Sequence, residues 1–196
     1  MNGLLFEIEE EPPLDIPGLT YVPNFISAKE EREFIACIDE GPWIHDLKRR
    51  VQHYGYRYDY KARMVTSDSY LGPLPKWINS LSSRLAEDDI FAKNPEQLIV
   101  NEYLPGQGIS AHIDCVPCFG DAIAIISLGS SVMMQFDKGT ERREYYLKPR
   151  SLAVISGSAR YDWTHAIPAR QSDKVGGIKI PRKRRVSLTF RTMILT

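Results

Sequence analysis

The chain has 196 residues, of which 43% are hydrophobic and 26% are charged, a composition typical of one soluble globular domain. It excludes a collagen-like, coiled-coil or largely disordered chain. No apolar run approaches the roughly 18 residues that span a bilayer, so we expect no membrane partner. Three cysteines cannot all pair with one another, which favours an intracellular location, cytoplasmic or, in a eukaryote, nuclear. We expect a monomer.

Basic and acidic residues are balanced at 25 each, which at first argues against a nucleic-acid partner. The charges are nevertheless distributed unevenly. Residues 1–40 contain two basic and ten acidic residues, whereas residues 170–191 contain eight and one, and residues 46–63 contain six and two. Such asymmetry can mark a surface for a polyanion. A solvated surface loop at 170–184 accounts for the charges of that segment equally well.

Two helices are predicted in the first half of the chain. Ser27 and Glu30 form a capping-box pattern ahead of an apolar stripe, and Gly41-Pro42 gives a stop signal. A second helix is predicted over residues 76–86, where apolar residues recur at helical spacing.

From residue 98 onward, short strand-like runs are separated by turn residues. We expect strands at 98–103, 109–114, 122–128, 131–137, 144–148, 151–156, 160–166 and 185–194. Many short strands at this spacing favour a sandwich, jelly roll or barrel, with the helices covering one face. The predicted fold class is therefore mostly β with flanking helices (α+β).

A candidate metal site begins with His112 and Asp114, two residues apart on an expected strand and so on one face of it. His165, in another expected strand, would complete the two-histidine, one-carboxylate triad of non-haem Fe(II) oxygenases. The His-x-Asp pattern is weak by itself. A strand-end histidine that is hydrogen-bonded to the neighbouring aspartate explains it as well.

The segment 185–191 alternates strictly between polar and apolar residues. If its apolar face packs in the core, Arg185 and Arg191 on the polar face must line a wet cavity, because buried guanidinium groups require anions. Two such arginines suit a dicarboxylate. Asn101 and Tyr103 add an amide and a phenol that can hydrogen-bond a keto-acid oxygen. A surface strand and an edge-strand pair are the structural alternatives.

Taken in order, these motifs resemble those of the AlkB family of Fe(II)- and 2-oxoglutarate-dependent dioxygenases. The resemblance covers about residues 17–194 and rests on Asn101-x-Tyr103-x-Pro105-Gly106, His112-x-Asp114, Ser127-Leu128-Gly129, Gly157-x-Ala159-Arg160-Tyr161-x-Trp163-x-His165 and Arg185-x5-Arg191. It implies a double-stranded β-helix (jelly roll) domain at 17–196, with a substrate-recognition lid at about 45–65. Residues 1–16 would be an acidic extension.

The resemblance implies that His112, Asp114 and His165 bind Fe(II), and that Asn101 and Tyr103 contact 2-oxoglutarate. Arg185 would pair with the distal carboxylate of 2-oxoglutarate and Arg191 with the carboxylate beside its keto group. Ser187 departs from the asparagine of the bacterial founding member. With O2 as the second cosubstrate, the implied reaction demethylates or dealkylates nucleic-acid bases and releases succinate, CO2 and an aldehyde.

Residues 49–60 interleave arginines with Tyr54, Tyr56, Tyr58 and Tyr60, so a strand here would present four phenol rings on one face. A tyrosine-rich strand packed under a helix is the alternative. The family's lid occupies this region, and its resemblance favours substrate contacts from Arg50, Tyr54 and Tyr56, with Arg160 as a further candidate. The partner would be alkylated DNA or RNA, with tRNA possible.

Two other enzyme activities remain open. The motifs look closest to the AlkB homologues that modify the tRNA wobble uridine, which points to hydroxylation of a modified tRNA nucleoside. Demethylation of a protein side chain is the other. A catalytically silent jelly-roll binding module would have no need for both the triad and the arginine pair. Cys115 and Cys118 could suggest zinc, but too few further donors remain, so two loop thiols near the active site are expected.

Overall fold

The computed structural model describes residues 15–62 and 64–194, and in them strands predominate. The strands are Leu19–Val22 (β1), Val51–Tyr54 (β2), Gln97–Tyr103 (β3), Ile109–His112 (β4), Phe119–Gly129 (β5), Val132–Lys138 (β6), Glu141–Leu147 (β7), Leu152–Ile155 (β8), Thr164–Ile167 (β9), Ser172–Val175 (β10), Ile178–Pro181 (β11) and Arg185–Met193 (β12). The α-helices are Ala28–Asp39 (α1), Asn79–Glu87 (α2) and Gly157–Tyr161 (α3), and two 3-10 turns are Ser67–Ser69 (η1) and Lys76–Ile78 (η2).

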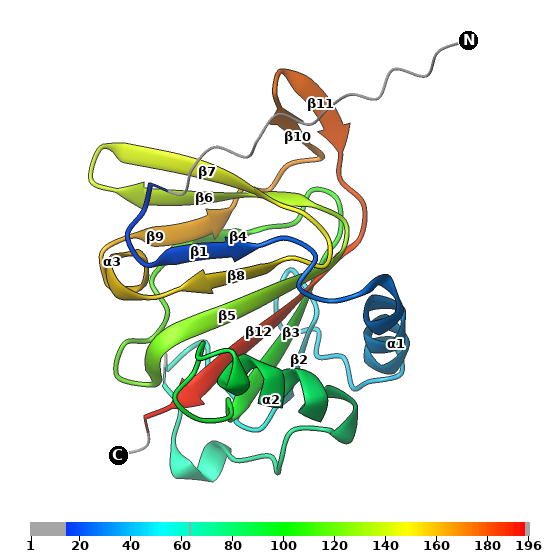
Figure 1. Cartoon of the computed structure of the whole chain (residues 1–196), viewed down its shortest axis with the longest axis vertical. Helices are drawn as coiled ribbons and strands as arrows, with labels where there is room; N and C mark the ends of the chain where they lie inside the picture. The colour runs from blue at the N-terminus through cyan, green and yellow to red at the C-terminus, as the bar shows by residue number, and fades with distance from the viewer. Residues whose placement is uncertain (1–14, 63, 195–196) are drawn as a thin grey trace.

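The strands form two antiparallel sheets and a separate hairpin (Figure 1). The larger sheet has the order β1-β8-β5-β12-β3-β2, the smaller has the order β4-β9-β6-β7, and β10 pairs with β11. Strand β12 lies in the middle of the larger sheet, paired with β5 on one side and β3 on the other. No helix in the described part of the chain is long and apolar enough to cross a membrane.

The larger sheet separates two hydrophobic clusters. One lies between the sheets and includes Ile125 of β5 and Phe136 of β6. The other lies between the larger sheet and the helices, where Ile38 and Leu81 pack with Leu188 of β12. Figure 1 shows α1 and α2 beside the larger sheet, away from β6 and β7. The expected jelly roll with helices on one face is therefore confirmed.

Both predicted helices are present. In α1 the Glu30 N–H donates to Ser27 Oγ at 3.1 Å and the Ser27 N–H donates to Glu30 Oε2 at 2.7 Å, so the capping box is formed. The second helix begins as the 3-10 turn η2 and continues as α2.

Residues 160–166, expected as one strand, are divided between α3 and β9. Arg160 lies in the short helix, where its guanidinium donates to the carbonyl oxygens of Asp114 and Cys115. Strand β9 begins only at Thr164. The helical turn allows Ala159 and Arg160, which are adjacent in sequence, both to be buried, whereas adjacent residues of a strand point to opposite faces.

The segment 170–184, which the sequence left open between a loop and a polyanion surface, contains the β10–β11 hairpin. Gly176 and Gly177 have φ values of +53° and +83°, as a two-residue hairpin turn of type I′ requires. At the base of the hairpin, Arg182 donates to both carboxylate oxygens of Asp173 at 2.6 and 2.7 Å. The strands β1 and β10–β11 were not predicted. Of the expected extension 1–16, residues 1–14 lie outside the described residues.

Candidate active site

Three potential metal ligands meet at the end of the smaller sheet. His112 ends β4 and pairs directly with His165 of β9, and their ring centroids are 4.4 Å apart. Asp114 follows two residues after His112, with 3.9 Å between His112 Nε2 and Asp114 Oδ1. One ligand atom from each residue lies within 4.8 Å of the others. This arrangement could bind a metal as a facial triad.

Each member of the triad is in a state suited to ligation. His112 Nδ1 lies 2.8 Å from the Ser110 carbonyl oxygen, so this nitrogen carries the proton and Nε2 is left with its lone pair. Burial lowers the pKa of His165 to about 4, which keeps the imidazole neutral. Asp114 Oδ2 is buried without a hydrogen-bond partner among the described residues, so it has a lone pair available.

The charge of Asp114 is held by a neighbouring arginine. Burial alone would raise the pKa of Asp114, but the guanidinium of Arg191 and the nearby His165, His112 and Arg160 lower it to about 2. Arg191 Nη2 donates to Asp114 Oδ1 at 3.0 Å. Asp114 is therefore a carboxylate at neutral pH.

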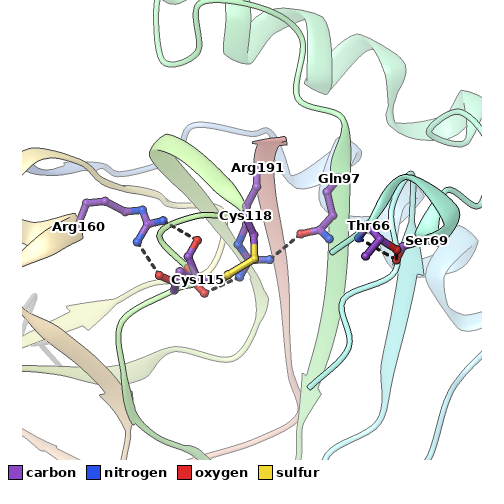
Figure 2. Close-up of a disulfide and its surroundings, with 8 residues drawn as sticks. Thr66, Ser69, Gln97, Cys115, Cys118, Arg160 and Arg191 are labelled. Carbon is purple, nitrogen blue, oxygen red and sulfur yellow. Dashed lines mark hydrogen bonds and ion pairs between the residues drawn. A yellow bond between two sulfur atoms is a disulfide. The ribbon is translucent and has the colours of Figure 1, made fainter. Parts of the chain in front are cut away.

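Arg160, a predicted substrate residue, is instead buried behind the metal site, with 2% of its surface exposed. Its Nη1 donates to the Asp114 carbonyl oxygen at 2.9 Å and its Nη2 to that of Cys115 at 3.3 Å (Figure 2). The side chain is not among those that line the cavity. In this position Arg160 fixes the backbone that carries Asp114.

Cys115 and Cys118 form a disulfide immediately after Asp114, visible in yellow in Figure 2. The expectation of two loop thiols was therefore wrong. The N–H groups of Cys118 and Phe119 both point to the Cys115 carbonyl oxygen, and this turn brings the two sulfur atoms together.

In the described residues, the triad is the one group of three or more potential metal ligands.

A cavity of about 660 Å³ opens beside the triad. Ser187, Thr189 and Arg191 line it from β12, whereas Val186, Leu188 and Phe190 of the same strand are buried against the helices. The predicted division of this strand into a polar face and a core face is confirmed, and three of the four polar residues line the cavity. Arg185, the fourth, is not among the lining residues and lies buried beside Tyr103. Asn101 and Tyr103 line the cavity from β3, in register with Ser187 and Arg185.

Both predicted arginines have buried donors without partners. Arg185 is 2% exposed, lies with its Cζ 5.5 Å from the centre of the Tyr103 ring, and donates only from Nη2, to Ser127 Oγ at 2.8 Å. Its Nε and Nη1, and Nε of Arg191, have no hydrogen-bond partner among the described residues. Burial lowers the pKa of Arg185 to about 10, so the group is still charged at neutral pH.

Unpaired buried guanidinium groups are costly unless an anion meets them. The donor set therefore fits a dicarboxylate such as 2-oxoglutarate, and the triad fits Fe(II).

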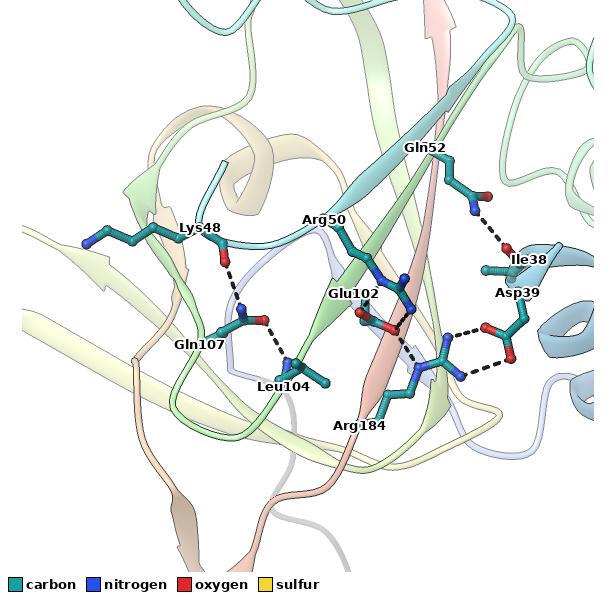
Figure 3. Close-up of polar contacts among 9 residues, drawn as sticks. All are labelled: Ile38, Asp39, Lys48, Arg50, Gln52, Glu102, Leu104, Gln107 and Arg184. Atoms are coloured by element: carbon teal, nitrogen blue, oxygen red, sulfur yellow. Dashed lines mark hydrogen bonds and ion pairs between the residues drawn. The ribbon is translucent and has the colours of Figure 1, made fainter. Parts of the chain in front are cut away.

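The other predicted substrate residues lie outside the cavity. Arg50 donates to Glu102 at 2.5 and 2.9 Å, in a surface network with Arg184 (Figure 3). Tyr54 packs in the cluster under the helices, and the ring of Tyr56 contacts that of Tyr70 in a tilted arrangement. The expected row of four tyrosines on one strand face was wrong, because β2 ends at Tyr54 and Gly55, with φ +78°, turns the chain.

The cavity is instead lined by Arg49, Tyr58 and Tyr60 from this part of the chain. The segment with interleaved arginines and tyrosines therefore reaches the cavity, though through other residues than those predicted. The sequence held no signal for which of two adjacent arginines, or which of four tyrosines, faces inward, because that depends on where the strand ends.

A family model described as the 2OG-Fe(II) oxygenase superfamily matches residues 18–191. The chain is 37% identical to the alkylated DNA repair protein ALKBH8 homolog of Arabidopsis thaliana, with 91% of this chain and 59% of that protein covered. It is also 37% identical to the tRNA (carboxymethyluridine(34)-5-O)-methyltransferase ALKBH8 of Mus musculus, with 81% and 25% covered. The chain thus spans little more than half of the plant relative and a quarter of the mouse relative.

Among solved structures, that of OsALKBH1 has a TM-score of 0.64 at 16% identity, with 93% of this chain and 100% of that chain covered. At this identity the likeness supports the fold alone.

Proposed function

Because the chain belongs to the AlkB family of the 2OG-Fe(II) oxygenase superfamily, we propose that it oxidises an alkyl group on a nucleic-acid base. It is a 2-oxoglutarate-dependent dioxygenase, a class that uses Fe(II), 2-oxoglutarate and O2. The observation that carries the proposal is one cavity lined by the triad of His112, Asp114 and His165 together with Arg191, whose buried Nε has no partner among the described residues. The unpartnered donors of Arg185 lie next to Tyr103, which also lines the cavity.

The triad would hold the iron, and groups around the triad keep its three ligand atoms ready to bind. Arg191 keeps Asp114 ionised, the Ser110 carbonyl keeps the proton of His112 on Nδ1, and burial keeps His165 neutral. With the triad as its ligands, bound iron supplies the oxidation by O2 and 2-oxoglutarate that hydroxylates a C–H bond and leaves succinate and CO2. The protein's task is to orient the reactants and exclude water.

The cosubstrate is bound by the polar face of the larger sheet. Arg185 takes the distal carboxylate and Arg191 the carboxylate beside the keto group, as in the family. Asn101 and Tyr103 add an amide and a phenol on the neighbouring strand β3. This assignment is supported by the unpaired Nε and Nη1 of Arg185, which need an acceptor.

The substrate base is bound on the opposite wall. Tyr58 and Tyr60 line the cavity, and the ring of Tyr58 lies 5.6 Å from that of Phe119. Aromatic rings stack on a base of any sequence, and an enzyme that acts on a base must take it out of the helix into such a pocket. Lys174 and Lys179 are cross-strand neighbours on the β10–β11 hairpin, and neither forms an ion pair with another described residue. Their charges support contact with the phosphate backbone.

The point of attachment of the oxidised carbon decides the product. If the oxidised carbon is attached to a nitrogen of the base, the hydroxylated group leaves as an aldehyde and the base is restored, so the reaction is demethylation or dealkylation. If it is attached to another carbon, the hydroxyl group stays, so the reaction is hydroxylation of a modified nucleoside. Similarity to the ALKBH8 proteins over most of this chain favours tRNA for the second outcome.

The test is mass spectrometry of nucleosides after incubation of the iron-loaded protein with methylated DNA and with bulk tRNA. We expect succinate together with the loss or the 16-dalton gain of one modified nucleoside, and both signals at background in His112→Ala. His45→Ala is the matched control, because His45 is exposed and is not one of the triad.

Succinate formation by His112→Ala at the wild-type rate would refute the metal assignment. Succinate formation by the wild type without change in any nucleoside would refute the nucleic-acid substrate.

A further inference from the structure

Arg49 faces the cavity because of the register between β2 and β3. Val51 pairs with Asn101 in an antiparallel ladder, so residue 49, just before the strand, lies beside Tyr103. Arg49 Nε donates to Asn101 Oδ1 at 2.9 Å, and Arg49 lines the same cavity as the triad. The alternation of side chains along a strand sends the next residue, Arg50, to the other face.

Arg49 differs from its neighbours in having no counterion. It is 9% exposed, yet none of the ion pairs between described residues includes it, whereas Arg50 pairs with Glu102 at 2.5 Å. The one acidic residue that lines the cavity, Asp114, is paired with Arg191. No atom of Arg49 is among the buried donors without partners, and the side chain lines the cavity. Its charge is therefore free to bind an anion there.

Arg49 and the arginine assigned to the distal carboxylate of the cosubstrate lie on different sides of Tyr103. The Cζ atoms of Arg49 and Arg185 lie 5.8 and 5.5 Å from the centre of the Tyr103 ring. Strand β3 lies between β2 and β12, so the two guanidinium groups approach Tyr103 from opposite sides. The proposed function assigns the two carboxylates of 2-oxoglutarate to Arg185 and Arg191. The other ring beside Arg49 is that of Tyr60, at 5.9 Å, on the proposed substrate wall.

We propose that Arg49 binds an anionic group of the substrate, either a carboxylate on the modified base or the phosphate of its nucleotide. The inference rests on the proposed function and narrows its substrate to one that carries an oxyanion into the cavity. Asn101 holds Nε, and the rings of Tyr60 and Tyr103 flank the guanidinium. The Nη groups are then preorganised for paired contacts with an oxyanion.

The test measures binding by calorimetry with Fe(II)- and 2-oxoglutarate-loaded protein under anaerobic conditions, so that no turnover consumes the probe. The first probe pair is 5-carboxymethyluridine and its methyl ester, which differ by one carboxylate. The second is uridine 5′-monophosphate and uridine, which differ by the phosphate. The proteins are the wild type, Arg49→Gln and, as a control of equal charge and size change on the same segment, Arg50→Gln.

We expect the wild type to bind the charged member of one pair about tenfold or more tightly than the uncharged member. In Arg49→Gln the ratio of the two dissociation constants should be close to one, and in Arg50→Gln it should equal that of the wild type. A preference within the first pair assigns the carboxylate source, and one within the second pair assigns the phosphate.

A ratio near one for both pairs in the wild type would overturn the proposal, as would a ratio that survives in Arg49→Gln. Failure of every probe to bind would also overturn it. A tenfold weaker affinity for 2-oxoglutarate in Arg49→Gln, with an unchanged probe ratio, would assign Arg49 to the cosubstrate instead.

Two further measurements separate the possible failures. If Arg49→Gln does not fold, Arg49→Lys replaces it, and its ratio should fall about threefold or more because an ammonium lacks the planar fork; an unchanged ratio refutes the proposal. Succinate formation by the wild type tests the proposed function independently. Its absence refutes that function, whereas its presence with no charge preference refutes only the role of Arg49.

Discussion

The two walls of the cavity are built differently. The wall proposed to hold iron and 2-oxoglutarate consists of β12, β4 and β9, and β12 has a hydrogen-bonded neighbour on each side. The wall proposed to touch the substrate comes from the loop after β2. Among the described residues, its backbone is held by the isolated bridges Tyr56↔Tyr70 and Asp59↔Met64 and by a hydrogen bond from Gln97 Nε2 to the Tyr56 carbonyl oxygen, and not by a strand ladder. Regular strands fix the reaction chemistry, while a loop can change substrate contacts at little cost to the core.

Replacement of a β12 arginine should give the largest effect. Arg185→Gln removes the charge proposed to meet the distal carboxylate, so the 2-oxoglutarate concentration for half-maximal succinate formation should rise by a factor on the order of 100. Arg184→Gln is the matched control, because Arg184 points to Glu102 and Asp39 on the surface. Equal responses of the two variants would remove Arg185 from the cosubstrate site.

A change in the loop wall should affect the substrate alone. Tyr60→Ala removes a ring proposed to stack on the base, so oxidation of the nucleic acid should fall about tenfold. The succinate formed without substrate should stay at the wild-type rate. Tyr70→Ala is the control, since Tyr70 is 53% exposed and does not line the cavity. Loss of substrate-free succinate formation in Tyr60→Ala would show that the two walls are not independent.

The outward face of β3 should contribute stability that depends on pH. Burial raises the pKa of Glu102, but hydrogen bonds from Arg50 and Arg184 outweigh it and leave the pKa below its usual 4.5. The carboxylate therefore stabilises the fold above that value, and this contribution is lost as the pH falls through the lowered pKa.

Glu102→Gln should lower the free energy of unfolding at pH 7 by roughly 1–3 kcal/mol. Urea unfolding at decreasing pH should show the difference between wild type and variant shrinking below about pH 4.5. A difference that is constant with pH would contradict this account.

The smallest effect is expected far from both walls. Ser27→Ala removes the N-cap of α1 and should lower the free energy of unfolding by about 1 kcal/mol, with an unchanged 2-oxoglutarate requirement. Ser80→Ala, at an exposed position in α2, should cause no such loss. A change in cosubstrate requirement in Ser27→Ala would show coupling between the helix layer and the cavity.

The sequence predicted the facing of side chains correctly on the strand wall of the cavity and incorrectly on the loop wall. The alternation of residues 185–191 predicted a cavity face and a core face, and a central strand held on both sides can realise only that division. The same rule failed at residues 54–60, because the ladder ends at Tyr54 and Gly55 turns the chain. An alternation of period two predicts which side chains share a face only where the hydrogen-bonded strand ladder continues.

The sequence alone therefore determined the jelly-roll class, the family, and the Fe(II) and 2-oxoglutarate chemistry, because those depend on motifs within strands or on residues two apart. Only the tertiary structure decided which arginine of the pair at 49 and 50 enters the cavity, that Arg160 supports the Asp114 backbone, and that Cys115 and Cys118 form a disulfide. These outcomes depend on register, strand ends and contacts between distant segments, which local sequence patterns do not encode.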